Sequence, residues 1–179
     1  MIRNLILGNK RLQKFWWLMY KVAIKGLNYD RGHVPSANGE SFAAKYVLSK
    51  LNKREPVIFD IGANRGQYLE MFMGVVSQPV RIYCFEPQVS AYRFLEKVAA
   101  NYPSVRIENL GFSDTEKEQA LYRNTEASEY ASLYPARYTQ YNVELDKSEM
   151  ISLTTLDAYC RKSQIDTIDF LKIDVEGAE

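Results

Sequence analysis

The sequence predicts an α/β protein with a doubly wound, mostly parallel sheet, and three observations carry this prediction. Short apolar runs rich in β-branched residues recur at residues 57–61, 80–85, 105–110 and 168–174. Amphipathic segments of helical period separate the first three runs. A turn punctuated by glycines directly follows the first run. Strands separated by helices of this length form βαβ units, whose right-handed crossovers place helices on both faces of a parallel sheet.

Length and composition agree with one globular domain that carries a short appendage. The 179 residues are 46% hydrophobic and 25% charged, with a formal net charge of +1. These values exclude collagen-like, disulfide-scaffold and wholly disordered proteins. The near-neutral charge argues against nucleic-acid binding. No apolar run reaches the length of about 18 residues that a membrane-spanning helix needs.

Cysteine and histidine are too few for two common kinds of site. Cys84 and Cys160 form no Cys-x-x-Cys pair, and His33 is the only histidine. A Cys/His zinc site therefore lacks ligands, and a Ser-His-Asp triad would depend on His33 alone. We interpret both cysteines as small buried residues of a protein in the reducing cytoplasm, and His33 as an exposed loop residue.

The first predicted domain, residues 1–40, is a basic amphipathic helix followed by a linker at residues 28–40. Residues 1–29 contain six lysines and arginines and no acidic residue. Four lysines recur at helical spacing on one face. The apolar residues of another face are Leu12, Trp16, Met19 and Ala23. Such a helix either packs on its own domain or makes peripheral contact with a membrane surface, and both interpretations stay open. A signal peptide is disfavoured, because lysines interrupt the apolar stretch.

The second predicted domain, residues 41–179, begins with alternating helices and strands. A helix over residues 41–51 precedes the first strand, which Pro56 and Gly62 flank. Helices over residues 67–76 and 89–100 follow the first and second strands, because their apolar residues recur every three to four positions. The run at residues 105–110 then alternates like a third strand.

The alternation weakens after the third strand. Residues 119–123 and 150–154 look like two short extended pieces. Between them lies a polar stretch, which we interpret as a mobile insert or lid and which contains Tyr130, Tyr134, Tyr138 and Tyr141. The spacing Thr154-x-x-Asp157 predicts a capping box that opens a helix through Arg161. The fourth strand follows, and the chain ends where a helix is due, so we expect a domain truncated after its fourth main strand.

The turn after the first strand has the pattern Asp60-x-Gly62-x-Asn64-x-Gly66. Ligands of parallel sheets bind at the carboxyl ends of the strands, and glycines let the backbone approach a ligand closely. The glycines are four residues apart, and no third glycine would pack the helix, so the turn is not the fingerprint of a pyrophosphate cradle. An acid at the strand end fits an ammonium group better than a phosphate. The methionyl end of S-adenosylmethionine carries an ammonium, which Asp60 would neutralise, and a carboxylate, which the turn amides would meet.

Glu86 ends the second strand, where an acid in a nucleoside-binding βαβ unit takes the ribose hydroxyls. Glu86 therefore favours both an adenosyl ligand and a dinucleotide without deciding between them. The structural alternative is that Asp60 and Glu86 only cap loops at the strand ends.

Several motifs, taken in order, resemble those of the FkbM-type, S-adenosylmethionine-dependent methyltransferases. They span residues 56–179, and the most specific is the closing Lys-Ile-Asp-Val-Glu-Gly-Ala-Glu at residues 172–179. The motifs are residues 59–66, Phe85-Glu86-Pro87, residues 109–114, Thr155-Leu156-Asp157 and residues 171–179. The resemblance implies a class I, Rossmann-like methyltransferase fold that uses S-adenosyl-L-methionine. It also implies O-methylation of a hydroxyl on a sugar or another small molecule.

By motif match, the resemblance implies a role for each of these segments in holding the cofactor. The residues that would face its methionyl part are Asp60, Gly62, Asn64 and Gly66. Glu86 would hold the ribose. The adenine would be lined by residues 109–113, which include Asn109, Gly111 and Ser113, with Asp114 nearby. Phe112 departs from the small apolar residues that the family often has there, and we expect it to alter the adenine contact.

The end of the fourth strand supplies the candidate catalytic carboxylates. An alcohol acceptor has to lose a proton, and histidine is almost absent, so we expect Asp174 to act as the base or to orient the acceptor. Glu176 lies two residues further on. The alternatives are that the two bind a divalent cation or that Asp174 caps a turn. Lys172 alternates onto the same side and would pair with Asp174, which would weaken that carboxylate as a base.

Two other classes of protein remain as rival interpretations. An NAD-dependent oxidoreductase would use the same Glu86, although the glycine spacing argues against it. A non-catalytic binding module would retain the nucleoside fold without chemistry. Binding of S-adenosylhomocysteine without binding of NAD would favour the methyltransferase over both.

Overall fold

The computed structural model describes residues 12–26, 39–51, 55–128, 131–135, 137–138 and 143–175. The chain divides into two units, Met1–Ala43 and Ala44–Glu179. Some residues discussed above lie outside the described ranges, namely His33, Tyr130, Tyr141, Glu176 and most of the predicted linker.

The described part of the basic leader forms a helix, as the lysine spacing predicts. This helix, α2, covers Gln13–Gly26, and the next, α3, covers Glu40–Lys50. Among the helices in the described part of the chain, none combines the length and the apolar character that crossing a membrane requires.

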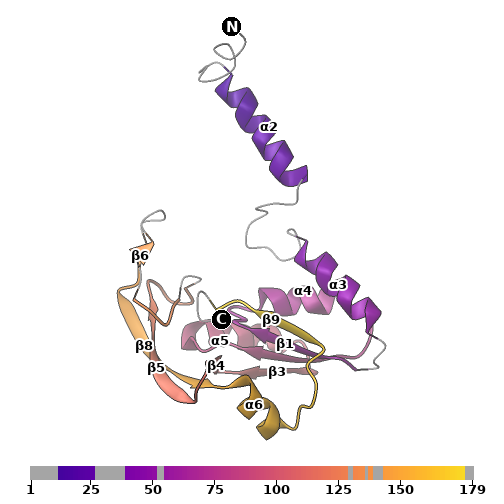
Figure 1. The fold of residues 1–179 in the computed structure, drawn as a ribbon, viewed down its shortest axis with the longest axis vertical. Coiled ribbons are helices and arrows are strands. Elements are labelled where there is room, and N and C mark those ends of the chain that lie inside the picture. The colour runs from indigo at the N-terminus through magenta and orange to yellow at the C-terminus, as the bar shows by residue number, and fades with distance from the viewer. Residues whose placement is uncertain are drawn as a thin grey trace. The chain divides into compact units, whose positions relative to one another are not determined.

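Four parallel strands form the main sheet in the order β3-β2-β1-β9 (Figure 1). Their bounds are Val57–Ile61 for β1, Arg81–Phe85 for β2, Val105–Glu108 for β3 and Phe170–Ile173 for β9. Each predicted strand therefore forms, although three of them are shorter than their apolar runs. The predicted α/β class with a mostly parallel sheet is confirmed.

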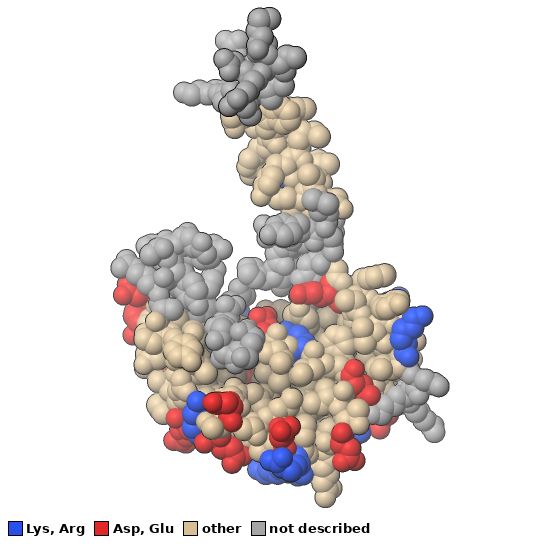
Figure 2. All heavy atoms as spheres, viewed as in Figure 1, with Lys and Arg blue, Asp and Glu red and all other residues tan. Residues whose placement is uncertain are grey.

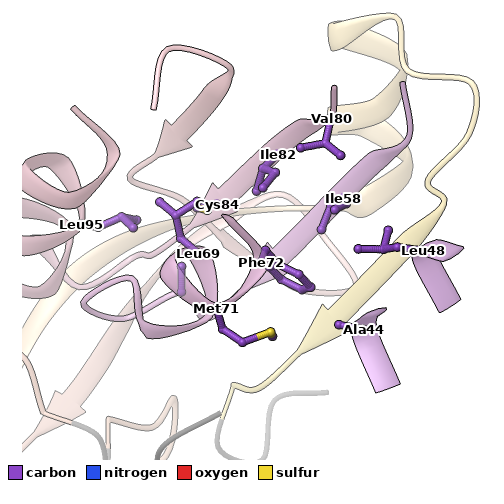
Figure 3. Close-up of a cluster of buried hydrophobic side chains, with 11 residues drawn as sticks. Ala44, Leu48, Ile58, Leu69, Met71, Phe72, Val80, Ile82, Cys84 and Leu95 are labelled. Atoms are coloured by element: carbon purple, nitrogen blue, oxygen red, sulfur yellow. The ribbon is translucent and has the colours of Figure 1, made fainter. Parts of the chain in front are cut away.

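Both faces of the sheet are covered, because successive side chains of a buried strand point to opposite sides. On one face, Ile58 and Ile82 pack against helices α3, α4 (Gln67–Val75) and α5 (Val89–Ala99). Figure 3 shows Phe72 of α4 and Leu95 of α5 among the side chains of this cluster. On the other face, Phe59 and its neighbours pack against Tyr159 of α6 (Leu156–Ser163).

A second sheet follows β3 and has the order β4-β8-β5. Its strands are β4 (Gly111–Phe112), β5 (Lys117–Arg123) and β8 (Lys147–Thr154). The two extended pieces expected from the sequence are thus longer than expected, and β5 pairs with β8 antiparallel from Lys117↔Leu153 to Arg123↔Lys147. Between them, β6 (Arg137–Tyr138) and β7 (Val143–Glu144) form a small hairpin.

One local prediction needs correction, and a second concerns Phe112, whose effect on an adenine contact stays a prediction. Helix α6 is capped by Thr155, whose side-chain oxygen accepts a hydrogen bond from the amide of Ala158 at 3.1 Å. Thr154 is instead the last residue of β8 and donates to Glu116, so the N-cap is displaced by one residue, and Ala158, three residues after it, cannot complete a capping box. Phe112 makes edge-to-face contact with Phe85 at 4.8 Å between ring centroids, which places it in the apolar cluster under α6.

Candidate functional site

The carboxyl ends of β1, β2 and β9 bring the candidate site together. The register pairs Asp60 of β1 with Cys84 on one side and with Lys172 of β9 on the other. Glu86 directly follows β2, and Asp174 directly follows β9. The parallel topology therefore places side chains more than a hundred residues apart at one edge of the sheet.

Asp60 and Lys172 form a buried charge pair at the centre of this edge. Asp60 is fully buried, and the Lys172 ammonium lies 3.0 Å from its Oδ1. The ammonium thus serves Oδ1, while Asp60 Oδ2 has no hydrogen-bond partner among the described residues. Lys172 also donates to the carbonyl oxygen of Gly62 at 2.8 Å. Burial raises the pKa of Asp60, and the attraction of Lys172 opposes that rise only in part.

Lys172 is closer to Asp60 than to the partner expected from the sequence. Its ammonium lies 3.8 Å from Asp174 Oδ2 and 4.4 Å from the centre of the Tyr68 ring. The Asp174 side chain is 60% exposed, and its backbone amide donates to the carbonyl of Ile61 at 3.1 Å. Asp174 is thus exposed to solvent, while the Lys172 ammonium lies closer to Asp60.

The glycines of the turn are needed for close packing within the protein. Gly62 has a φ of +76°, and a Cβ at this position would lie 1.9 Å from the carbonyl oxygen of Asp174. Gly66 has a φ of +94°, and a Cβ there would lie 3.2 Å from Leu95 of α5. Gly66, the second glycine of the turn, thus seats the start of α4 against α5.

The amides of the turn are largely used inside the protein. The Gly62 and Ala63 amides both donate to the carbonyl of Phe85, and the Gly66 amide donates to Ala63. The Asn64 amide donates to Glu86 Oε2 at 2.8 Å. A ligand carboxylate would consequently need other hydrogen-bond donors. The free N–H groups in the first turn of α4 are the nearest such donors along the sequence.

Glu86 is buried and holds two backbone amides. Its Oε2 accepts from Asn64 and its Oε1 from Gln88, each at 2.8 Å. Glu86 therefore caps loops, as the structural alternative expected, and its remaining lone pairs are available for hydroxyl groups. Burial raises the pKa of Glu86 to about 7, although the two backbone hydrogen bonds and Lys172 lower it.

The raised pKa of Glu86 predicts a specific dependence of stability on pH. The ordinary value is 4.5 and the folded value is about 7, so between these values the folded state holds a proton that the unfolded state has released. The free energy of unfolding should then fall by about 3 kcal/mol as the pH rises from 4.5 to 7, and should stay level above that.

Urea denaturation of the parent and of Glu86→Gln at several pH values measures this fall. In Glu86→Gln the fall should shrink to the part contributed by Asp60, whose raised pKa acts in the same direction. Glu118→Gln changes an exposed carboxyl and is the matched control. An equal fall in the parent and in Glu86→Gln would show that Glu86 is ionised in the folded state throughout.

Residues 109–114 divide between the site and its surroundings. The Asn109 amide group donates to the carbonyls of Glu86 and Pro87 at 2.9 and 3.0 Å, so it fixes the loop that carries Glu86. Gly111 is buried, and a Cβ there would meet Leu153 at 2.6 Å. Ser113 and Asp114 hydrogen-bond to each other and to Thr115 on the exposed turn before β5. Their contribution to an adenine pocket stays a prediction.

Two features of the site were not found from the sequence. Lys172 was not assigned to Asp60, although the strict alternation of β9 could have suggested it once the pairing with β1 was known. Gln88, which is buried, accepts hydrogen bonds from Ser90 and from the amide of Ser128 through its Oε1. The loop after β5 therefore docks on the start of α5, and no sequence pattern marks that contact.

The arrangement is rich in hydrogen-bond acceptors. Asp60 Oδ2 and the side-chain oxygen of Asn64 are buried without hydrogen-bond partners among the described residues, and Asp60 Oδ1 faces the Lys172 ammonium. The Glu86 carboxylate lies beside Asn64, whose backbone amide donates a hydrogen bond to it. Such a set fits a ligand that offers an ammonium group and hydroxyl groups, as S-adenosylmethionine does.

Neither a metal site among the described residues nor an open surface depression replaces this edge of the sheet as the candidate site. In the part of the chain that the structure describes, no three acidic, cysteine or histidine side chains gather as a metal site. An open depression of about 570 Å³ is lined by α6 and residues 164–168. Its lining includes none of the predicted cofactor-binding or catalytic residues, so we do not assign the reaction to this depression.

Comparison with known proteins identifies the family through a family model, and two individual proteins are similar to the chain. A family model described as "Methyltransferase FkbM domain" matches residues 60–179. The chain is 25% identical over 144 residues to "2-O-methyltransferase NoeI" of Sinorhizobium fredii (strain NBRC 101917 / NGR234). A solved structure of "Methyltransferase FkbM" from Methylobacillus flagellatus KT is similar over 72% of this chain, with 18% identity and a TM-score of 0.45.

The chain is shorter than both of these relatives. The matches cover 75% of this chain but 59% of the curated methyltransferase, and 28% of the chain in the solved structure.

Proposed function

The chain belongs to the FkbM methyltransferase family, as its motifs predicted, and on that premise we propose that it binds S-adenosyl-L-methionine at the carboxyl edge of β1, β2 and β9. We further propose that it methylates a hydroxyl on a sugar or another small metabolite. The observation that carries this proposal is a pair of buried acceptor atoms without hydrogen-bond partners among the described residues, Asp60 Oδ2 and Asn64 Oδ1, next to the Glu86 carboxylate. The curated relative's name, a 2-O-methyltransferase, supports an oxygen atom as the acceptor.

Each site residue has a distinct task in this proposal. Asp60 and Asn64 accept hydrogen bonds from the methionyl ammonium. Glu86 accepts from the ribose hydroxyls through lone pairs that its two backbone partners leave open. Lys172 keeps the buried Asp60 carboxylate ionised, and Asn109 holds the Glu86 loop in place.

Asp174 is the proposed catalytic base. When bound, S-adenosylmethionine supplies a methyl group attached to a positively charged sulfur. The neutral thioether that remains after the transfer is a good leaving group. The remaining requirements are alignment of the acceptor hydroxyl and removal of its proton. The exposed carboxylate of Asp174 lies at the same strand edge as Asp60 and reaches solvent, where an acceptor would enter. Glu176, two residues on, is the second acid that we assign to this task.

Ligand affinity should report the ionisation of Glu86. Hydroxyl groups bind a carboxylate more strongly than a neutral carboxyl, and the pKa of Glu86 is about 7, so the affinity for S-adenosylhomocysteine should rise as the pH rises through that value. Glu86→Gln should weaken binding by about 1–3 kcal/mol at about pH 8, which is roughly five- to 150-fold, and should remove most of the pH dependence. Titration calorimetry on both sides of the Glu86 pKa measures both effects.

The control and the competing ligand decide the outcome. Glu118→Gln, on the exposed side of β5, should bind like the parent protein. Binding of NAD in place of S-adenosylhomocysteine would favour an oxidoreductase, and binding of neither would favour a module without this activity. Unchanged affinity of Glu86→Gln would remove Glu86 from the ribose site.

A further inference from the structure

Helix α2 exposes a dense set of aromatic and aliphatic side chains. No described residue of the unit Met1–Ala43 is buried. The exposed apolar side chains of α2, each between 41% and 60% exposed, are Phe15, Trp16, Trp17, Leu18, Met19, Tyr20 and Val22. A helix that presents so many large apolar groups needs a partner surface, because soluble proteins seldom leave such patches uncovered.

The basic residues of α2 occupy one narrow side of the helix, while apolar residues cover the opposite side and also flank the lysines, as Trp17 and Leu18 do. At about 100° per residue, Lys14 and Lys21 lie about 20° apart on one narrow stripe. Trp16, Met19 and Ala23 lie on the opposite side. Figure 2 shows one side of α2 with almost no charged atoms. The Lys21 ammonium lies 3.4 Å from the centre of the Trp17 ring, at the border between the two sides.

The chemistry of this helix selects its partner. The leader up to residue 29 carries six positive charges and no negative charge, so its charge complements an anionic surface. Both tryptophans of the chain lie in α2, next to Tyr20. Tryptophan and tyrosine favour the headgroup level of a bilayer, where an apolar ring and a polar N–H or O–H are both satisfied.

We propose that α2 lies in the headgroup region of an anionic phospholipid bilayer. Trp16 and Met19 face the acyl chains, while Lys14 and Lys21 reach the lipid phosphates, as long basic side chains do at membrane surfaces. This contact tethers the unit Ala44–Glu179 to a membrane surface. The inference rests on α2 alone and does not depend on the proposed activity.

Tryptophan fluorescence tests this proposal in the full 179-residue chain, because Trp16 and Trp17 are its only tryptophans. Addition of vesicles of phosphatidylcholine with about a third of phosphatidylglycerol should move the emission to shorter wavelength, and the protein should sediment with them. Vesicles of phosphatidylcholine alone should produce much less of both effects. Equal effects with both vesicles, or none with either, would overturn the proposal.

Paired variants locate the contact. Lys14→Gln with Lys21→Gln should lower vesicle partitioning about 25-fold, at about fivefold for each charge removed. Lys147→Gln with Lys162→Gln removes the same charge from exposed positions of the other unit and should have little effect. Trp16→Ala should also weaken sedimentation and leaves Trp17 as the reporter. Short-wavelength emission without vesicles would contradict the proposal, because it would show that α2 already packs on protein. If that emission changes with protein concentration, the partner is a second copy of the chain; if it does not, the partner is the same chain.

Discussion

The Gly62→Ala variant should unfold far more easily than the parent protein and should lose its affinity for S-adenosylhomocysteine. The new Cβ would lie 1.9 Å from the carbonyl oxygen of Asp174, and the φ of +76° is itself unfavourable for alanine. The backbone after β9 would have to move away from the turn, and both Asp174 and Lys172 would move with it. We expect a loss of at least about 3 kcal/mol in the free energy of unfolding.

A second glycine provides the matched control. Gly74 lies in α4 and is exposed, and a Cβ added there would have no other atom within 4 Å. Gly74→Ala should therefore stabilise the helix by about 0.5–1 kcal/mol. Urea denaturation followed by circular dichroism measures both variants. If Gly62→Ala were as stable as the parent, the close approach of β9 to the turn would be wrong.

Lys172→Met should destabilise the protein by about 3–5 kcal/mol at neutral pH, because it leaves the fully buried Asp60 carboxylate without its counter-ion. Methionine keeps much of the length of the lysine stem, so the loss of packing is small. The destabilisation should grow as the pH rises, since at low pH Asp60 binds a proton and no longer needs the ammonium.

A double variant separates the charge pair from general damage. Asp60→Asn in the Lys172→Met background removes the orphaned charge and should recover a large part of the lost stability. The coupling free energy of this cycle, measured by urea denaturation, should be several kcal/mol in favour of the pair. Additive effects of the two changes would mean that Asp60 and Lys172 do not interact in the folded protein.

The sheet could be predicted from the sequence because its buried strands are short apolar runs, several of them bounded by Pro or Gly. Pro56 and Gly62 bound β1 on both sides, and apolar runs of this kind are typical of strands covered on both faces. The β5–β8 pair was predicted too short, because β5 begins with the polar residues Lys117 and Glu118, which alternation cannot distinguish from a loop. The cap of α6 was displaced because Thr154 and Thr155 are both capable N-caps, and only the end of β8 decides between them.

The candidate site could be predicted only where consecutive segments form it. Asp60 lies in the first strand and Glu86 directly follows the second, and consecutive strands of a βαβ unit are usually neighbours, so the closeness of these two residues could be predicted. The pairing of Lys172 with Asp60 depends on the register between β1 and β9, which joins parts of the chain more than a hundred residues apart. Gln88 likewise acquires its partner, Ser128, only when the loop after β5 folds back on α5. Tertiary contacts of this kind leave no local pattern in the sequence.

A crystal structure of the protein with S-adenosylhomocysteine tests the central claim most directly. The account predicts the ribose hydroxyls within hydrogen-bond distance of the Glu86 carboxylate and the methionyl ammonium at Asp60 Oδ2 and Asn64 Oδ1. Asp174 should face the sulfur from the open side of the edge. A ligand bound in the depression beside α6, or a complex in which Glu86 and Asp60 both keep only their protein partners, would contradict the account.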